Sequence, residues 1–379
     1  MRKTIFKCLF ISLLFLSSSG LYAQSGVDST TEARKNQLFG KVKNFSFSFY
    51  VDAYFGFMLK NSKDTSDIIP FSGNCPMYNQ IRLNVTALEI YYNAEKVRGK
   101  MALQFGDAPN LLSSPSSQWT RYIRQANFGF RIVKDLWFDV GYIFNPVGYE
   151  SSWSVLNQVS SVTIGGYFEP GSVLGVKLSY KFSDKFSGGI MVGDPFSIAY
   201  ADNTNMAGIL FLTYKPTGNL FINYNNFLGN QATRESKVNN FLLYNNLIIN
   251  YNPIKTVELV GQLDLGGQTN SRKPPDTTKI ATMFSGFLQA TYRFNDHFAL
   301  TGRYEFFNDP NGFLSGVNKL TDRGVRTRGF TACFEYKPVS IGFIRLIYRY
   351  LGGYPGSKEF YSKTSDNMEE ILFSTGVRF

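Results

Sequence analysis

Apolar and polar side chains alternate along residues 45–57, and this alternation constrains the fold more than any other feature. Phe45, Phe47 and Phe49 are separated by Ser46 and Ser48, and the pattern continues to residue 57. A period of two residues is typical of a β-strand with one apolar and one polar face. Soluble sandwiches also contain such strands, but they average roughly 5–6 residues. This segment reaches the roughly 9–11 residues that a tilted strand needs to cross a membrane.

Fifteen further segments alternate in a similar way, so the sequence predicts sixteen strands in all. After the first, we place them at 79–93, 96–107, 121–133, 136–148, 172–182, 186–194, 205–215, 219–229, 238–251, 256–267, 281–294, 297–308, 326–337, 341–352 and 369–379. The alternation within the second strand changes phase near Ala87. This change predicts a β-bulge near that residue.

Short turns and long connections also alternate along the chain. Short turns follow the even-numbered strands, whereas longer loops follow the odd-numbered ones, at 59–78, 108–120, 149–171, 195–204, 230–237, 268–280, 309–325 and 353–368. An even number of antiparallel strands with this asymmetry is typical of outer-membrane barrels, whose turns are periplasmic and whose loops are extracellular. We therefore predict an all-β fold, a transmembrane antiparallel β-barrel of 16 strands at residues 44–379.

The amino-terminal residues predict export. Arg2, Lys3 and Lys7 precede an apolar stretch that runs to Leu16, and Ala23 offers a cleavage position. We expect a signal peptide at 1–23 and a periplasmic segment at 24–43. The full chain has a formal net charge of +11, so removal of three cations leaves +8 on the mature chain.

Several function classes do not fit this composition. The chain has a single histidine, His297, which falls in a predicted short turn, so enzymes that use histidine as a general base are not expected. Three cysteines without CxxC or HExxH spacing predict neither a metal site nor a cofactor, and a bridge between Cys75 and Cys333 is not expected. The basic residues are spread singly through an exported chain, which argues against nucleic-acid binding.

Four groups of short motifs resemble the OmpL-like family of β-barrel outer-membrane porins. They are 50–54 (YVDAY), 136–141 (LWFDVG) leading to 147–151 (VGYES), 180–185 (YKFSDK) and 307–312 (FNDPNG). The resemblance spans most of the mature chain and implies a porin fold with no defined substrate. Residues 145–147 read Asn-Pro-Val, where the family pattern has a more polar stretch with a His.

The alternation within the strands places more basic than acidic residues at inward-facing positions of the predicted barrel. A barrel of about 16–18 strands encloses an aqueous channel, and 24–43 is too short for the plug domain of larger transporters. Rings of Lys and Arg bias a pore toward anions, an effect that salt screens. Each charged residue could instead form an ion pair within the wall. The candidate pore-lining residues on the strands are Arg82, Arg98, Lys100, Arg131, Arg303, Glu305, Arg345 and Arg349.

The loop at 149–171 is the longest of the eight, and its Ser-, Val- and Gly-rich middle carries few charges. One hypothesis folds it into the lumen, where Glu150 and Glu169 would face Arg82, Arg98 and Arg131 across a constriction. The alternative is an extracellular loop that only caps the rim.

These patterns predict a porin in the outer membrane of a Gram-negative-type bacterium. It would pass small hydrophilic solutes by passive diffusion with a weak preference for anions, and it would not be an enzyme. The alternatives are a substrate-selective channel and a non-conducting barrel that serves as an adhesin or structural anchor. Expected partners are outer-membrane lipid, the solutes and the barrel-assembly machinery, because terminal Phe379 resembles its recognition signal. Homo-oligomerisation stays open.

Overall fold

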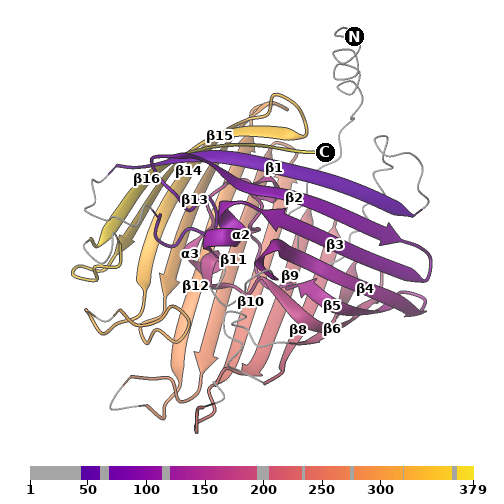
Figure 1. The fold of residues 1–379 in the computed structure, drawn as a ribbon, viewed down its shortest axis with the longest axis horizontal. Helices are drawn as coiled ribbons and strands as arrows, with labels where there is room; N and C mark the ends of the chain where they lie inside the picture. The colour runs from indigo at the N-terminus through magenta and orange to yellow at the C-terminus, as the bar shows by residue number, and fades with distance from the viewer. Residues whose placement is uncertain are drawn as a thin grey trace.

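The barrel is closed, and its strands follow one another in sequence order. A computed structural model describes residues 44–59, 68–112, 120–193, 205–232, 235–273, 277–318, 320–360 and 365–379. Within them, sixteen antiparallel strands form one sheet, which closes where β1 pairs with β16 (Figure 1). The predicted fold class is therefore confirmed. The predicted signal peptide at 1–23 and the segment 24–43 lie outside the described residues.

The observed strands match the predicted ones closely, with differences of a few residues at their ends. They are β1 Phe45–Met58, β2 Ile81–Asn93, β3 Val97–Phe105, β4 Ile123–Val133, β5 Leu136–Phe144, β6 Ser172–Lys181, β7 Phe186–Gly193, β8 Ala207–Thr217, β9 Leu220–Asn230, β10 Phe241–Ile254, β11 Val257–Gln268, β12 Ala281–Arg293, β13 Phe298–Asn308, β14 Arg326–Tyr336, β15 Gly342–Gly353 and β16 Asn367–Arg378. The short helical elements between strands include α2 Asp107–Leu111, η2 Ser154–Leu156 and α3 Ile164–Phe168.

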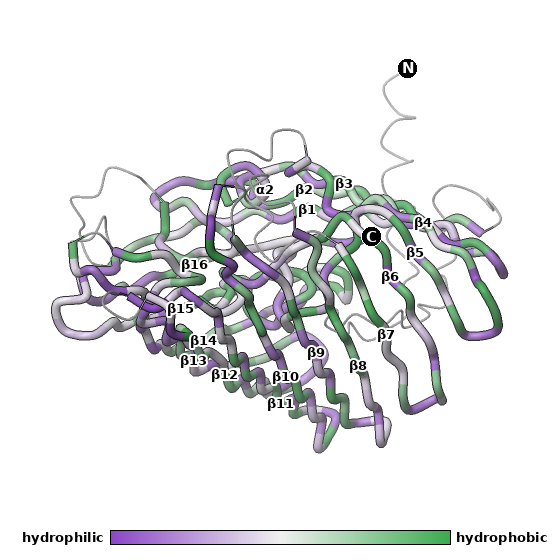
Figure 2. The backbone as a smooth tube through the Cα atoms, turned by 90° about the horizontal axis from the view of Figure 1, so that it is seen from below, coloured by the Kyte–Doolittle hydropathy of each residue, from purple (hydrophilic) through white to green (hydrophobic). Residues whose placement is uncertain are grey.

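The outward face of the barrel is apolar because strand alternation sends the larger hydrophobic side chains there. On β1, Phe45, Phe55 and Phe57 are exposed, whereas Tyr50 and Tyr54 face inward and are buried. Figure 2 shows apolar residues recurring along the strands and hydrophilic residues at many hairpin tips. Among the described residues, none of the helices is long and apolar enough to span a bilayer.

The two ends of the barrel differ in how the strands are joined. β4 ends at Val133 and β5 begins at Leu136, whereas β5 ends at Phe144 and β6 begins only at Ser172. We call the end with the short joints the turn rim and the end with the long joints the loop rim. In the tight turn after β4, Asp135 has a φ of 65°, in the left-handed region that Asp tolerates better than most residues.

The bulge in β2 lies three residues from its predicted position. The pairing of β1 with β2 shifts between Asp52 and Ala53, and Asn84 is the extra residue on β2. The shift brings two donors to the buried Asp52 carboxylate: Asn84 Nδ2 at 2.8 Å and the backbone N–H of Val85 at 2.7 Å. The prediction near Ala87 was therefore wrong in place, because sequence phase reveals a break only after the chain has passed it.

Near the loop rim, the inward faces of the strands are apolar. Ile143, Val173 and Phe227 point inward there and are buried. Ile69 and Ile164, which belong to long connections, pack against this part of the wall. The predicted channel is therefore not lined by polar side chains over its full length, because inward-folded connections complete a hydrophobic core in the loop-rim half.

Candidate functional site

The third long connection, residues 145–171, folds into the barrel, and we call it loop 3. Trp153 and Ile164 of this loop are 0% and 1% exposed. The loop stays compact because it satisfies its own backbone: the Thr163 side chain accepts from the Gly166 N–H at 3.1 Å and caps α3. The sequence left open whether this loop folds into the lumen or only caps the rim, and in the structure it folds into the lumen.

Two buried arginines hold loop 3 by its backbone. Arg345 on β15 donates to the carbonyl oxygens of Ser154 and Asn157 at 2.8 and 2.7 Å. Arg303 on β13 donates to the carbonyl oxygen of Ser161 at 2.8 Å. Hydrogen bonds with an ionised donor are about twice as strong as neutral ones. The strand arginines therefore fix the path of the loop across the lumen.

The two loop carboxylates do not lie where the constriction hypothesis put them. Glu150 accepts from Arg303 Nη1 at 2.6 Å, and Glu169 accepts from Gln262 Nε2 on β11. The predicted arrangement of both opposite Arg82, Arg98 and Arg131 is therefore wrong. Loop 3 crosses the lumen toward β11 and β13, and strand phase carries no information about the wall that a loop reaches.

Burial changes the acidity of both loop carboxyls. It raises the pKa of Glu150, against the opposing effect of the Arg303 charge. It raises the pKa of Glu169 well above its usual range, and the nearby Asp264 and Glu150 carboxylates add to that rise. No cation pairs with Glu169 among the described residues, whereas Glu150 has Arg303 at 2.6 Å. The surroundings of Glu169 therefore favour the protonated form of its carboxyl group.

The three arginines predicted to face loop 3 have other partners. Arg82, near the loop rim, forms an ion pair with Asp107 of α2 at 2.6 Å. Arg98 on β3 pairs with Asp139 on β5 at 2.6 Å. Arg131 on β4 lies over the ring of Trp137 at 4.9 Å, near the turn rim. These arginines belong to the wall, as the ion-pair alternative had it for Arg82 and Arg98.

Four of the remaining candidates are buried on the inner wall beside loop 3, in two separate groups of ion pairs. Arg349 donates to both oxygens of Glu305 at 3.0 Å, and Arg303 lies 3.6 Å from the same carboxylate. Glu305 also accepts from the backbone N–H of Ile164 in loop 3 at 2.8 Å. Arg345 pairs with Glu335 at 2.7 Å. Arg303, Glu305 and Arg345 thus contact loop 3 directly, and Arg349 holds Glu305 in place.

Toward the turn rim, cations outnumber carboxylates on the inner wall, and we call this set the turn-rim ring. Among the described residues, Asp139, Glu89, Glu335 and Glu258 share seven cationic partners: Arg98, Lys177, Lys100, Arg378, Lys337, Arg345 and Arg293. Apart from Arg345, these cations have side chains that are 15–33% exposed, against 3–9% for the carboxylates. The surface presented to the lumen is therefore cationic.

Sequence reasoning missed two residues that organise the lumen. Arg124 on β4 is buried, donates to Ser151 Oγ at 2.8 Å and lies 4.1 Å from the Trp153 ring. A register shift between Ala102 and Leu103 on the neighbouring strand obscures its phase. Asp107 lies two residues after the end of β3 and pairs with Arg82. A carboxylate near a strand end was therefore the signal that the sequence offered.

Other reactive side chains do not form a second centre in the described part of the chain. No group of three His, Cys, Asp or Glu there is arranged to hold a metal ion. Cys75 and Cys333 are free thiols buried in the same apolar cluster. His297 is exposed in its turn, with Nδ1 2.8 Å from the carbonyl oxygen of Lys337.

The family model described as "putative beta-barrel porin-2, OmpL-like" matches residues 44–379, which is the whole barrel. The chain belongs to this family. The resemblance read from its short motifs is thereby confirmed, and so is a porin-like barrel of the outer membrane. A comparison with curated protein sequences found no match.

Solved porin structures share the fold of this porin-2 member at low sequence identity. OmpF of Salmonella typhi, in complex with daunomycin, has a TM-score of 0.60 and 11% identity over 88% of this chain and 97% of its own. The anion-selective porin of Comamonas acidovorans has a TM-score of 0.58 and 10% identity over 88% and 99%. OmpT of Vibrio cholerae, in a form lacking loop L8, has a TM-score of 0.57 and 13% identity over 88% and 99%.

Proposed function

We propose that this porin-2 member passes small hydrophilic solutes passively across the outer membrane and weakly prefers anions. The observation that carries the preference is the turn-rim ring, in which seven cations surround four carboxylates among the described residues. A ring of Lys and Arg raises the local concentration of anions, and salt screens the effect. The fold shared with an anion-selective porin is compatible with this proposal.

Within this proposal, the predicted site residues have three roles. Arg98, Lys100 and Arg131 border the turn-rim half, where solutes meet the cationic surface. Glu150 and Glu169 belong to loop 3, which forms the constriction. Arg303, Glu305 and Arg345 hold the loop from the wall, and Arg349 orients Glu305. Arg82 stiffens the wall near the loop rim through Asp107.

The packing of loop 3 supports a second candidate, a substrate-selective channel. Trp153 of the loop stacks with Tyr50 on β1 at 5.7 Å between ring centroids, and its indole N–H donates to Gln104 on β3. A lumen crossed by a pinned loop leaves little width for large solutes. If loop 3 closed the lumen completely, the barrel would not conduct and would serve instead as an adhesin or anchor.

Export and assembly complete the proposal. Residues 1–23 would direct the chain through the inner membrane as a cleaved signal peptide. Phe379 would then present the final strand to the barrel-assembly machinery. Its ring packs against Phe49 on β1 at 5.3 Å, so the terminal residue also helps to close the barrel.

Three lysines allow the anion preference to be tested without leaving a buried carboxylate unpaired. Lys100, Lys177 and Lys337 each share a carboxylate that keeps an arginine partner. We expect the triple Lys→Gln variant to shift the reversal potential in a KCl gradient toward cations. The matched control is Lys134→Gln, Lys185→Gln and Lys255→Gln, which removes three exposed lysines from turns. A wild-type protein that prefers cations, or equal shifts in both variants, would contradict the proposal.

A further inference from the structure

Two asparagines interrupt the apolar outward face of the barrel. Asn226 on β9 and Asn245 on β10 are direct cross-strand partners. Away from the strand ends, they are the only amide side chains on the outward face of the described strands. Asn245 lies between Phe241 near the loop rim and Tyr251 near the turn rim, with Leu243 and Leu247 as its outward neighbours on the strand. The pair therefore lies within the hydrocarbon-facing band.

The amide pair is only half satisfied within one chain. Asn245 Oδ1 accepts from the Tyr224 hydroxyl at 2.7 Å and from Asn226 Nδ2 at 2.9 Å. Among the described residues, Asn245 Nδ2 has no acceptor and Asn226 Oδ1 has no donor. Lipid tails offer no hydrogen bonds, so polar groups facing them are costly unless protein satisfies them. An open donor and an open acceptor thus lie side by side on the outer wall.

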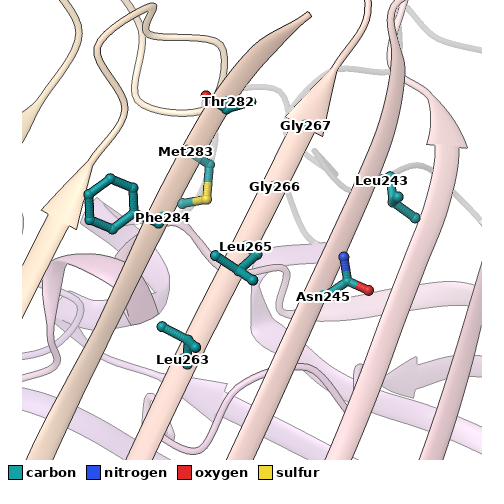
Figure 3. Close-up of a pocket in the computed structure, with 9 residues that line it drawn as sticks. All are labelled: Leu243, Asn245, Leu263, Leu265, Gly266, Gly267, Thr282, Met283 and Phe284. Atoms are coloured by element: carbon teal, nitrogen blue, oxygen red, sulfur yellow. The ribbon is translucent and has the colours of Figure 1, made fainter.

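Beside Asn245, the outer wall is hollowed. A groove of about 360 Å³ crosses β10, β11 and β12, and its lining includes Leu243, Leu263, Leu265 and Phe284 (Figure 3). Gly267 opens the groove, because it presents no side chain at an outward position of β11. An apolar hollow with an amide at its edge requires an occupant that both fills space and forms hydrogen bonds.

We propose that the outward face of β9–β12 is the contact surface between two copies of this chain. An acyl chain would fill the groove but leave the amides unpaired. A second copy brings an Asn245 Nδ2 donor and an Asn226 Oδ1 acceptor of its own, which match the open groups of the first. Such self-complementarity is what a symmetric pair of protomers requires.

A second groove shows why this wall, and not another, is the contact surface. It measures about 300 Å³ and lies on the outward face of β2–β4, where Ile90, Met101 and Phe128 border Gly99. Its size is similar, and its lining also includes Asn127 and Lys100, but strand phase turns both side chains inward. Asn127 donates to the carbonyl oxygen of Tyr142 at 3.1 Å, and Lys100 pairs with Glu89. Lipid alone can fill this second groove without leaving a polar group unpaired.

Two glycine substitutions separate the grooves. At each of Gly267 and Gly99, an added Cβ would have its two nearest heavy atoms at 3.5 Å and 4.0 Å, which is ordinary van der Waals contact. A side chain therefore fits at either position on the isolated barrel. We expect Gly267→Trp to convert the detergent-solubilised protein from an oligomer to a monomer, measured by light scattering on a sizing column. Gly99→Trp is the matched control and should leave the oligomer intact. Heat-modifiable migration on a gel verifies folding in each case.

The amides are tested by Asn226→Leu combined with Asn245→Leu, which keeps the face apolar and removes the hydrogen-bonding groups. We expect at least a tenfold increase in the dissociation constant of the oligomer. A monomeric wild-type protein would overturn the proposal, including one that retains bound lipid in native mass spectrometry. So would an oligomer that survives both the Gly267→Trp and the double Asn→Leu changes, or one that Gly99→Trp disrupts.

Discussion

At the scale of single residues, the inward arginines hold a loop as much as they line a channel. Strand phase correctly predicts that Arg303 and Arg345 point inward. It cannot predict their acceptors, because the contacts with Ser161 and Ser154 join residues that are 142 and 191 positions apart. The direction of a strand side chain is local information, whereas its partner depends on where a distant loop passes.

Replacing Arg345 with methionine should destabilise the folded barrel. The change removes three hydrogen bonds to loop 3, two to carbonyl oxygens and one to Ser160 Oγ, and it removes the cation closest to the buried Glu335 carboxylate. Breaking a buried ion pair costs roughly 3–5 kcal/mol, and we expect a loss of free energy of unfolding toward the lower end because Lys337 stays near Glu335. Urea unfolding in lipid vesicles measures it. The double change Arg345→Met and Glu335→Gln should recover part of the loss, and a single variant as stable as wild type would contradict this account.

Loop 3 should loosen as the pH rises. The buried Glu169 carboxyl has a pKa raised well above its usual range, so the folded state binds this proton more tightly than the unfolded state does. Its contribution to stability is therefore complete below the ordinary Glu pKa of about 4.3 and is lost as the pH rises through the raised pKa. Hydrogen exchange in 160–171, corrected for intrinsic rates, should show lower protection at pH ~9 than at pH ~5. Glu169→Gln should remove that difference, and equal protection at both pH values in the wild type would count against it.

At the scale of elements, strands and turns were predictable and loop 3 was not. A strand such as β1 carries its period in its own residues, and the turn between Val133 and Leu136 is marked by the charged residues Lys134 and Asp135. Loop 3 has no period, and its place depends on Arg303 and Arg345 on distant strands. The bulge at Asn84 lies between these cases, since phase detected it but misplaced it by three residues.

The β2 bulge should contribute measurably to stability through the partners that it gives to Asp52. Asn84→Ala removes the donor 2.8 Å from the buried carboxylate and also the acceptor of the Cys75 backbone N–H. A buried polar group that loses its partner costs about 1–3 kcal/mol, which denaturant unfolding can resolve. Asn252→Ala near the turn rim is the control and should change stability by less than about 0.5 kcal/mol. Equal effects of the two substitutions would show that the bulge has no special role.

Shortening loop 3 should widen the lumen. Residues 153–162 carry the segment that meets Arg345 and Arg303, so replacing them with a short Gly-Ser linker removes the part of the loop that crosses the barrel. We expect the single-channel conductance to rise several-fold, provided that heat-modifiable migration verifies a folded barrel. An unchanged conductance would place the constriction elsewhere.

At the scale of the whole molecule, the barrel has an apolar outside, a cationic turn-rim half and an apolar loop-rim half. Strand phase predicted the apolar outside and an excess of inward bases, but it did not place that excess in one half of the barrel. The third feature is visible in the sequence as pairs such as Val173 and Leu174, or Leu242 and Leu243, where both faces of a strand are apolar. Such pairs indicate burial on both faces. They do not identify the long connections that cover the inner one.

Single-channel recording from the purified, folded protein in a planar bilayer tests the central claim most directly. The turn-rim ring and the constriction at loop 3 together predict small, stepwise conductance increments, with a reversal potential that favours anions in a KCl gradient. A verified folded barrel that produces no conductance steps would contradict the account, because loop 3 would then close the lumen and the adhesin or anchor reading would take precedence.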